Sequence, residues 1–354
     1  MIELFRHYRK QILLLAFPYL LIMFLLIYPA NLYVYSPGGL SEVERLIQVD
    51  YNEDKITEGT ISSTYIMTIE RPSFYEFIIG YLNPFSDIGI LTGSNLTYTN
   101  DEINQISYLD KATSVDAAII VAYQQAQLAN PDIQITLNQV TLVFGKATYL
   151  DHYDEIDFGD KFLYVEGDEG TVVTIYTQIA TYTTEQNEYT FHFQKEDGTE
   201  YSVLLSKDET THLFGITLKN YYLVDQDDTY PNYNVVDSSI GGPSGGLLQT
   251  LAIYNMLIDE DITHGLKIAG TGTINYDGSV GYIGGVKQKI ATAYLNHVDV
   301  FFIPYLDDTY TYDNYLEALR ACEELGIDPE GWLVPVASFS DAINYLNSLG
   351  GDSE

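Results

Sequence analysis

A chain of 354 residues with 46% hydrophobic residues is long enough to bury a sizeable core, so we expect one large or two modest domains. The net charge of −34, from 50 acidic and 16 basic residues, repels phosphate backbones and argues against a nucleic-acid-binding protein. Cys322 is the only cysteine, which excludes an intrachain disulfide and a cysteine-based zinc cluster. Because it falls on the apolar stripe of a predicted helix, we expect a core thiol. The six histidines are scattered, and we expect no metal and no cofactor.

An apolar, uncharged run covers residues 12–28, and the mostly uncharged stretch up to residue 35 makes it long enough to cross a bilayer. Basic residues precede this run and acidic residues follow it: Arg6, Arg9, Lys10, Glu42 and Glu44. This distribution predicts a cytoplasmic basic stub and a transmembrane anchor in residues 1–35, with lipid contact through residues 12–35 and an exported body. A signal peptide cleaved near Pro29 and Ala30 is the alternative, although no clear A-x-A site is present.

Residues 36–135 have the pattern of an α/β segment. The β-branched and aromatic residues of 60–70 predict a strand. Residues 115–129 predict a buried helix that ends before Asn130 and Pro131. We expect these two elements to belong to one α/β layer.

Residues 136–208 have a different pattern, with short strands between glycine, aspartate and asparagine turns. Alternation of apolar and polar residues predicts strands at 171–176 and 189–193. The Gly159-Asp160 turn, followed by a strand and then the turn 165–167, resembles a PDZ domain. We therefore expect this segment to be a small β-rich, PDZ-like insert.

Residues 209–354 return to an α/β pattern. We expect helices at 244–258 and 312–325, strands at 266–274, 298–303 and 333–336, and a final helix that begins at Ser338 with a capping box to Asp341.

A serine stands in a glycine-rich turn at the start of the helix predicted from residue 244. The turn runs from Ile240 to Gly246, with Ser244 flanked by Gly242, Pro243 and Gly245. Glycines permit a tight turn, and free amides at the start of a helix can bind an oxyanion. The pattern therefore makes Ser244 a candidate nucleophile. A simple N-cap serine is the alternative. A phosphate-binding loop is disfavoured because the G-x-x-x-x-G-K-[ST] pattern is absent.

A nucleophilic serine needs a base, and the sequence offers no plausible His/Asp pair, which points to lysine. Such a lysine must be buried or lie near positive charge, because a lysine of ordinary pKa is protonated at neutral pH. Lys287, in the apolar and glycine-rich sequence YIGGVKQK, is the candidate, and Lys289 is its neighbouring competitor.

Three motifs taken together resemble Lon proteases. GPSGG around Ser244 is similar to the family's GPSAG, and GGVKQK is similar to GGLKEK. Thr271 and Gly272 match a Thr-Gly pair that the family has between its serine motif and its lysine motif. The segments 314–318, 334–336 and 341–342 resemble the end of the same proteolytic domain. Two positions depart from the family pattern: Gly241 replaces a common aspartate, and Gly245 replaces alanine, which we expect to loosen the turn.

The resemblance implies an α+β fold, namely the Lon proteolytic domain with a PDZ-like insert and one transmembrane helix. The chain is similar to the membrane-anchored, PDZ-containing Lon-like proteases of bacteria that lack an ATPase module. This similarity implies an ATP-independent serine endopeptidase that acts outside the cytoplasm on unfolded or flexible proteins as a homo-oligomer. Its Ser244–Lys287 dyad would be oriented by Thr271, with an oxyanion hole formed by backbone amides between Gly242 and Gly245.

Two other functions stay open from the sequence. One is a catalytically inert, membrane-tethered, peptide-binding adaptor. The other is a solute- or glycan-binding surface protein, prompted by 32 tyrosines and 15 phenylalanines. The dispersion of these aromatic residues disfavours the second reading.

Overall fold

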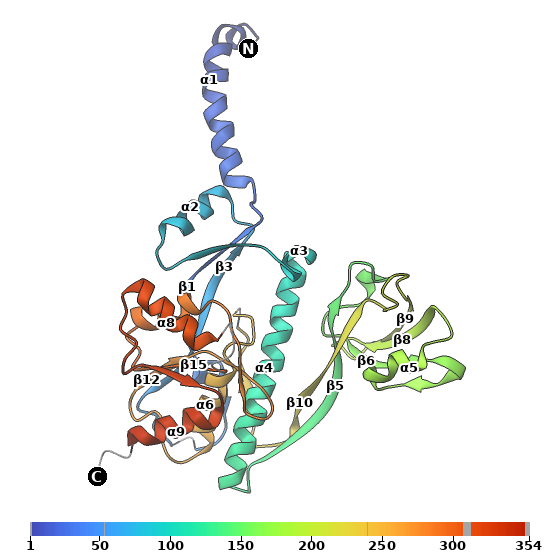
Figure 1. Cartoon of the computed structure of the whole chain (residues 1–354), viewed down its shortest axis with the longest axis vertical. Coiled ribbons are helices and arrows are strands. Elements are labelled where there is room, and N and C mark those ends of the chain that lie inside the picture. The colour runs from blue at the N-terminus through green and yellow to red at the C-terminus, as the bar shows by residue number, and fades with distance from the viewer. Residues whose placement is uncertain (1, 53, 239, 307–312, 351–354) are drawn as a thin grey trace.

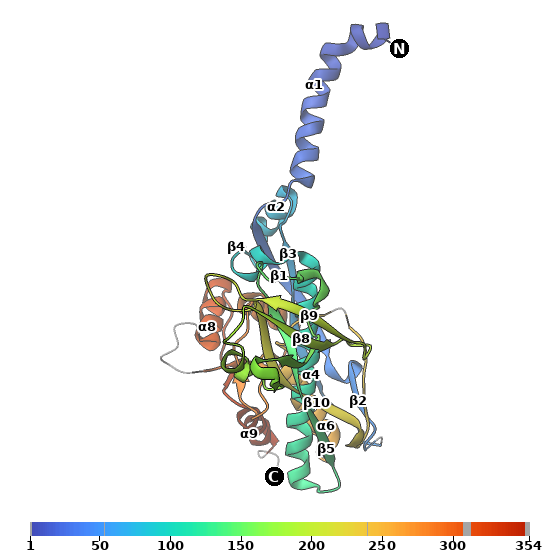
Figure 2. The same ribbon diagram turned by 90° about the vertical axis from the view of Figure 1, so that its right-hand side faces the viewer.

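The structure, a computed structural model, describes residues 2–52, 54–238, 240–306 and 313–350. It consists of an N-terminal helix, an α/β body, and a smaller β-rich body beside the long helix α4 (Asn100–Ala129) (Figure 1). The first helix, α1 (Ile2–Ile27), projects from one end of the body, and the last described helix, α9 (Phe339–Gly350), lies toward the other end (Figure 2). Within α1, residues Tyr8–Ile27 are long and apolar enough to cross a membrane.

A six-stranded mixed sheet forms the centre of the α/β body. Its strand order is β16–β15–β12–β3–β1–β4. The first four strands are parallel to one another, and β1 is antiparallel to both of its neighbours. The bounds are β1 Leu32–Glu42, β3 Thr60–Glu70, β4 Asp87–Ile90, β12 Lys267–Gly270, β15 Val300–Pro304 and β16 Leu333–Val336.

Helices cover both faces of this sheet, as the alternation of side chains along a strand requires. Phe302 of β15 packs into a core with residues of α4, α6 (Gly246–Leu257) and α9 (Phe339–Gly350). The adjacent Phe301 packs into a second core with residues of α7 (Val286–Leu295) and α8 (Asn314–Leu325). Burial on both faces explains why β15 is a continuous apolar run.

The smaller body has its own antiparallel sheet, of order β10–β5–β6–β8–β9, with β7 beside β6. The bounds are β5 Gln134–Lys146, β6 Lys161–Glu166, β7 Val172–Val173, β8 Glu188–Gln194, β9 Glu200–Ser206 and β10 Ile216–Tyr230. Its core combines aliphatic and aromatic side chains and includes Phe162, Phe191 and Phe193. A short helix, α5 (Ile179–Tyr182), lies outside the sheet.

The expected domain boundary after residue 208 needs correction. β10 lies beyond that boundary, yet it pairs with β5 from Ile216 to Tyr230 and is an outer strand of the same sheet. Figure 1 shows β5 and β10 as a long ribbon that leads from the base of α4 to the smaller body. The β-rich insert therefore begins and ends within this ribbon.

The predicted strands at 60–70 and 333–336 are confirmed, and those at 189–193 and 298–303 agree within two residues at each end. The strand predicted at 171–176 is wrong, because only Val172–Val173 pairs there. The strand predicted at 266–274 is also wrong as a single element. It is divided into β12 and β13 (Thr273–Ile274), because Gly272, with φ of +152°, turns the chain toward the serine loop.

The helices agree in part with those predicted from the sequence. The predicted helix at 115–129 is the second half of α4, which begins 15 residues earlier behind a capping box at Thr99. The predicted helix at 312–325 corresponds to α8, with residue 312 outside the described residues, and Cys322 is buried in it as expected. The remaining elements are α2 Phe74–Leu82, α3 Ser94–Thr97, β2 Ile47–Val49 paired with β11 Tyr233–Val235, and β13 paired with β14 Val280–Gly281.

Candidate active site

Ser244 lies in a tight loop, two residues before the first residue of α6. Two glycines precede it, one in a backbone conformation that favours glycine and one in close contact with α4. Gly242 has φ of +85°, a left-handed conformation that favours glycine. A Cβ atom on Gly241 would lie 2.3 Å from the Oγ of Ser107 in α4. A larger residue at position 241 would therefore force the Ser107 side chain or the loop to shift.

The side chain that reaches Ser244 is Lys289 of α7. Its Nζ lies 2.9 Å from the Ser244 Oγ and 2.9 Å from the Thr271 Oγ1. Only 2% of Lys289 is exposed. Burial lowers the pKa of Lys289 to about 7, although the nearby carboxylate of Glu317 opposes the shift. A large fraction of this amine is therefore neutral near pH 7 and able to accept a proton.

The prediction that Lys287 is the partner of Ser244 is corrected by this geometry. The Nζ of Lys287 lies 3.2 Å from a carboxylate oxygen of Asp87 and 3.4 Å from one of Glu324. Burial lowers the pKa of Lys287, but the hydrogen bonds and charges of these two carboxylates outweigh burial and raise it. Residues two apart on a helix point about 200° apart, so Lys287 faces away when Lys289 faces Ser244.

Thr271 joins the serine and the lysine. It follows directly after β12, and its hydroxyl donates to the Ser244 carbonyl at 3.0 Å while accepting from the Lys289 Nζ. The amide of Gly272 donates to the same carbonyl at 2.8 Å. Thr271 thus lies where an orienting residue is required, although the lysine that it contacts is Lys289 and not the predicted Lys287.

One face of α4 holds the loop that precedes Ser244 through three hydrogen bonds. The Gly242 amide donates to the Ser107 carbonyl (2.9 Å), the Lys111 Nζ to the Ser238 carbonyl (2.7 Å) and the Ser114 Oγ to the Pro243 carbonyl (3.0 Å). The three α4 residues are four and then three positions apart, and this spacing aligns them along one side of a helix.

Of the backbone amides between Gly242 and Gly245 that were predicted to bind an oxyanion, two are available for this role. The Gly242 amide already donates to α4, and Pro243 has no N–H. The amides of Ser244 and Gly245 make no hydrogen bond to any residue that the structure describes. Both lie at the N-terminus of α6, where the helix dipole favours negative charge. The turn is also packed rather than loose, since a Cβ on Gly245 would lie 3.2 Å from the Cβ of Ser63.

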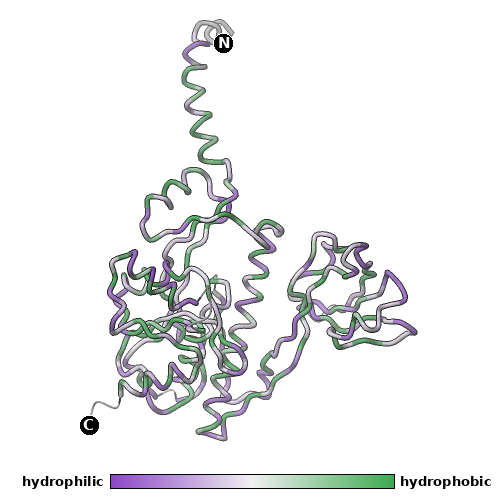
Figure 3. Tube along the Cα trace, viewed as in Figure 1, coloured by the Kyte–Doolittle hydropathy of each residue, from purple (hydrophilic) through white to green (hydrophobic). Residues whose placement is uncertain are grey.

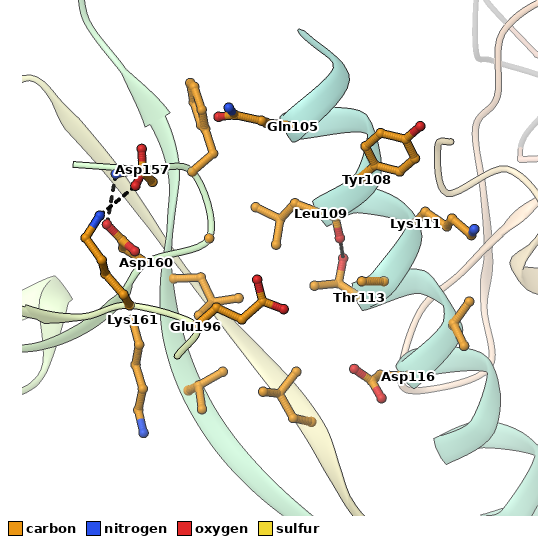
Figure 4. Close-up of a pocket in the computed structure, with 18 of the residues that line it drawn as sticks. Gln105, Tyr108, Leu109, Lys111, Thr113, Asp116, Asp157, Asp160, Lys161 and Glu196 are labelled. Atoms are coloured by element: carbon orange, nitrogen blue, oxygen red, sulfur yellow. Dashed lines mark hydrogen bonds and ion pairs between the residues drawn. The ribbon is translucent and has the colours of Figure 1, made fainter. Parts of the chain in front are cut away.

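A cleft of about 1520 Å³ lies between α4 and the smaller body. Figure 4 shows Asp116 of α4 and Glu196 of the smaller body pointing into this cleft from opposite sides, and Tyr108 and Lys161 also line it. Its third wall is the segment 235–238, which leads within six residues to Ser244. Burial raises the pKa of Asp116 to about 7, although a hydrogen bond from the Val224 backbone opposes the shift.

Comparison with known proteins identifies the segment that carries this site. Residues 237–313 match the Lon protease (S16) C-terminal proteolytic domain. This part of the chain is Lon-like. The Lon protease of Mesomycoplasma hyopneumoniae is 37% identical over 82 residues, which are 23% of this chain and 9% of that protein. The Lon protease of Ureaplasma parvum is 39% identical over 72 residues, 20% of this chain and 9% of that protein.

The predicted resemblance to Lon proteases is confirmed over this Lon-like segment, which contains Ser244, Thr271 and both lysines. The mixed α/β architecture agrees with the predicted α+β fold in its general class. The aligned region spans 9% of each relative's length, so the resemblance concerns the proteolytic segment alone. It indicates a serine-type peptidase and carries no information about the anchor helix or the smaller body.

Proposed function

We propose that the protein is a serine endopeptidase in which Ser244 is the nucleophile and Lys289 is the general base. The observation that carries this proposal is the contact of 2.9 Å between the Lys289 Nζ and the Ser244 Oγ. The lysine is buried and has a pKa of about 7, which is the condition under which an amine can serve as a base at neutral pH.

The proposed reaction is acyl transfer. Neutral Lys289 removes the proton of the Ser244 hydroxyl as the Oγ forms a bond to the scissile carbonyl carbon. The amides of Ser244 and Gly245 stabilise the negative oxygen of the tetrahedral intermediate. The C–N bond then breaks, and the protonated Lys289 gives its proton to the leaving amine. Water, deprotonated by the same lysine, attacks the acyl-enzyme and releases the second product.

Thr271 is proposed as the residue that orients the base. Its single hydroxyl proton points to the Ser244 carbonyl, so its oxygen can only accept from the Lys289 Nζ. A neutral amine has two N–H bonds and one lone pair. When one N–H points to Thr271, the lone pair can point to the Ser244 hydroxyl, which is the arrangement that proton transfer requires.

The two lysines of α7 provide a matched test of the assignment. The full-length protein and three variants, Ser244→Ala, Lys289→Ala and Lys287→Ala, are incubated with a fluorescently labelled disordered protein, and the rate of cleavage is measured. We expect Ser244→Ala and Lys289→Ala to lose about a thousandfold in rate. We expect Lys287→Ala to stay within about threefold, because its partly exposed ion pairs stabilise little.

The opposite result for the two lysines would restore the original assignment of Lys287. Full activity of Ser244→Ala would contradict the proposed function as a whole. Labelling of folded protein with a serine-directed phosphonate adds a readout independent of the substrate. If neither labelling of Ser244 nor cleavage occurred, the inert peptide-binding adaptor would be the better description.

We further propose the cellular setting and the substrate. The candidate membrane span in α1 supports a membrane anchor, and the basic residues before its uncharged run from residue 12 support a cytoplasmic N-terminus with an extracytoplasmic body. The cleft of about 1520 Å³ between α4 and the smaller body supports unfolded or flexible polypeptides as substrates. ATP-independent action is a proposal from the resemblance to Lon-like proteases that lack an ATPase module. A PDZ-like role for the smaller body and a homo-oligomer are proposals from the family resemblance.

A further inference from the structure

The helix α2 (Phe74–Leu82) exposes an apolar surface that is unusual for a protein in water. Six of its nine residues are large, apolar and between 40% and 74% exposed: Phe74, Tyr75, Ile78, Ile79, Tyr81 and Leu82. The helix packs on the body through Gly80, where a Cβ would lie 2.6 Å from a methyl group of Val34 in β1. The rest of the helix therefore points away from the body. A contiguous apolar surface of this kind is a mark of an interaction site.

The position of α2 indicates what covers this surface. α2 lies directly beside the end of α1, where the Ala30 amide donates to the Pro72 carbonyl at 2.9 Å (Figure 1). Figure 2 shows that α1 and α2 share one end of the molecule from a second direction. Figure 3 shows hydrophobic colouring both in α1 and in the neighbouring α2. Ile90 of β4, which pairs with Leu32 at the same end, is 70% exposed.

The charge of this region sets it apart from the rest of the chain. The protein has 50 acidic residues, yet residues 72–86 contain only one, Glu76. The carboxylate of Glu76 accepts from the Ser73 amide and hydroxyl, both at 2.8 Å, in a capping box that begins α2. The single charge is thus used to cap the helix. The outward surface combines aliphatic residues with tyrosines, the composition of side chains at a membrane–water interface.

We propose that α2 lies in the membrane–water interface, with its exposed apolar residues among the lipids of the leaflet that α1 enters. This inference rests on the proposed anchoring of the chain by α1. α1 and α2 then hold the α/β body at two points, so the body has a fixed tilt instead of swinging on a single tether. Because the net charge of −34 opposes approach to anionic lipids, the contact depends on apolar burial and not on charge.

Site-directed spin labelling tests this arrangement in the intact protein. Single cysteines replace Leu82 or Ile79 in α2, Leu20 in α1, and Leu128 at the far end of α4, which is 80% exposed and serves as the water-facing control. The native Cys322 is buried and does not need replacement. Each labelled protein is reconstituted in phosphatidylcholine nanodiscs, and the accessibility of the label to oxygen and to a water-soluble nickel chelate is measured.

We expect labels at positions 20, 79 and 82 to be reached by oxygen much more than by the nickel chelate, and the label at 128 to show the reverse. If positions 79 and 82 behave like 128 while position 20 lies in lipid, α1 is an anchor but the proposal for α2 is wrong. If neither reagent reaches position 82, protein covers the helix, for instance a second copy, and the proposal is also wrong. If position 20 itself faces water, the proposed anchoring fails together with the inference that depends on it.

A charged variant separates lipid contact from the fold. Leu82→Glu places a carboxylate in the proposed interface, whereas Leu128→Glu places one in water. We expect the first variant to make the spin label at position 79 several-fold more accessible to the nickel chelate, and the second to leave it unchanged. Unaltered accessibility at position 79 in Leu82→Glu would overturn the proposal.

Discussion

The amine of Lys289 is the group on which the proposed chemistry depends. Its environment is almost entirely apolar or hydroxylic, and Glu317 is the carboxylate that acts on its charge. Burial penalises the protonated amine, and Glu317 partly compensates for this penalty. The balance of these two effects sets a pKa of about 7, which is suited to a base that must work at neutral pH.

The pH dependence of activity follows from this balance. Because only neutral Lys289 can act as the base, kcat/KM for peptide cleavage should rise with pH and level off above about 7. The Glu317→Gln variant removes an anion that raises the pKa of Lys289, so the midpoint should move to lower pH. Initial rates between pH 5.5 and 9 measure both midpoints. A midpoint that moved with Lys287→Ala instead would show that the wrong amine had been assigned.

The same burial predicts a stability effect. Between about pH 7 and the ordinary lysine pKa of 10.5, Lys289 binds fewer protons in the folded state than in the unfolded state. Below pH 7 the amine is protonated in both states, and its burial destabilises the fold most. This destabilisation decreases as the pH rises from about 7 to 10.5. Lys289→Met should therefore raise the free energy of unfolding at pH 6 by roughly 2 kcal/mol while abolishing activity. Urea unfolding of both proteins at pH 6 and pH 9 measures this gain. It should shrink at pH 9.

The sequence contains a pattern that distinguishes Lys289 from Lys287 as the lysine on the buried face of α7. In α7, Val286, Lys289, Ile290 and Ala293 follow the spacing of one buried helix face, and Lys287 lies off this face. Motif similarity alone placed the base two residues too early. Helical periodicity, applied to the same residues, favours Lys289. The contacts from α4 could not be predicted in this way, because the first half of that helix lacks a clear apolar pattern.

At the scale of elements, α4 is the support of the serine loop. It binds the loop with one side of its first half and packs into the core with its second half. The glycine at position 241, which departs from the related motif, is explained by this contact. A Cβ atom at this position would lie 2.3 Å from the Ser107 Oγ, so a larger residue would require the Ser107 side chain or the loop to move.

A paired substitution tests this explanation. Gly241→Ala should push the loop away from α4 and lower kcat by about tenfold or more, because small displacements of a nucleophile are costly. Adding Ser107→Ala removes the oxygen that lies 2.3 Å from the new Cβ and should restore most of the activity. Ser107→Ala alone should be close to wild type, because the loop binds the Ser107 carbonyl rather than its side chain. Equal activity of the single and double glycine variants would contradict the steric argument.

The sequence predicted regular elements better than their interruptions. The strand at 60–70 and the buried helix before Asn130 follow from composition and from a helix-ending proline. The interruption of the strand at Thr271 and Gly272 does not, since it is imposed by hydrogen bonds to Ser244, 27 residues earlier. The insert boundary was missed for a similar reason. Pairing of β5 with β10 joins segments that are distant in sequence.

At the scale of the whole molecule, the α/β body and the smaller body are joined by the β5–β10 ribbon and enclose one cleft beside α4. The cleft has apolar walls with charged residues of both signs, among them Lys161, Asp116 and Glu196 (Figure 4). This mixed lining is consistent with the proposed polypeptide substrate. Its third wall, the segment 235–238, ends six residues before Ser244, and α4 contacts both this segment and the serine loop.

Filling the cleft should therefore affect long substrates selectively. Ala112 is a small, exposed residue of α4 in the cleft wall, and Ala112→Trp should raise KM for an unfolded protein several-fold by occupying the space that the chain requires. Cleavage of a short peptide, which needs only the region around Ser244, should change little. Leu128→Trp, at the exposed end of the same helix, is the matched control and should alter neither substrate. Equal losses on both substrates would mean that Ala112→Trp disturbs the serine loop through α4, and an unchanged KM for the unfolded protein would exclude the cleft as its path.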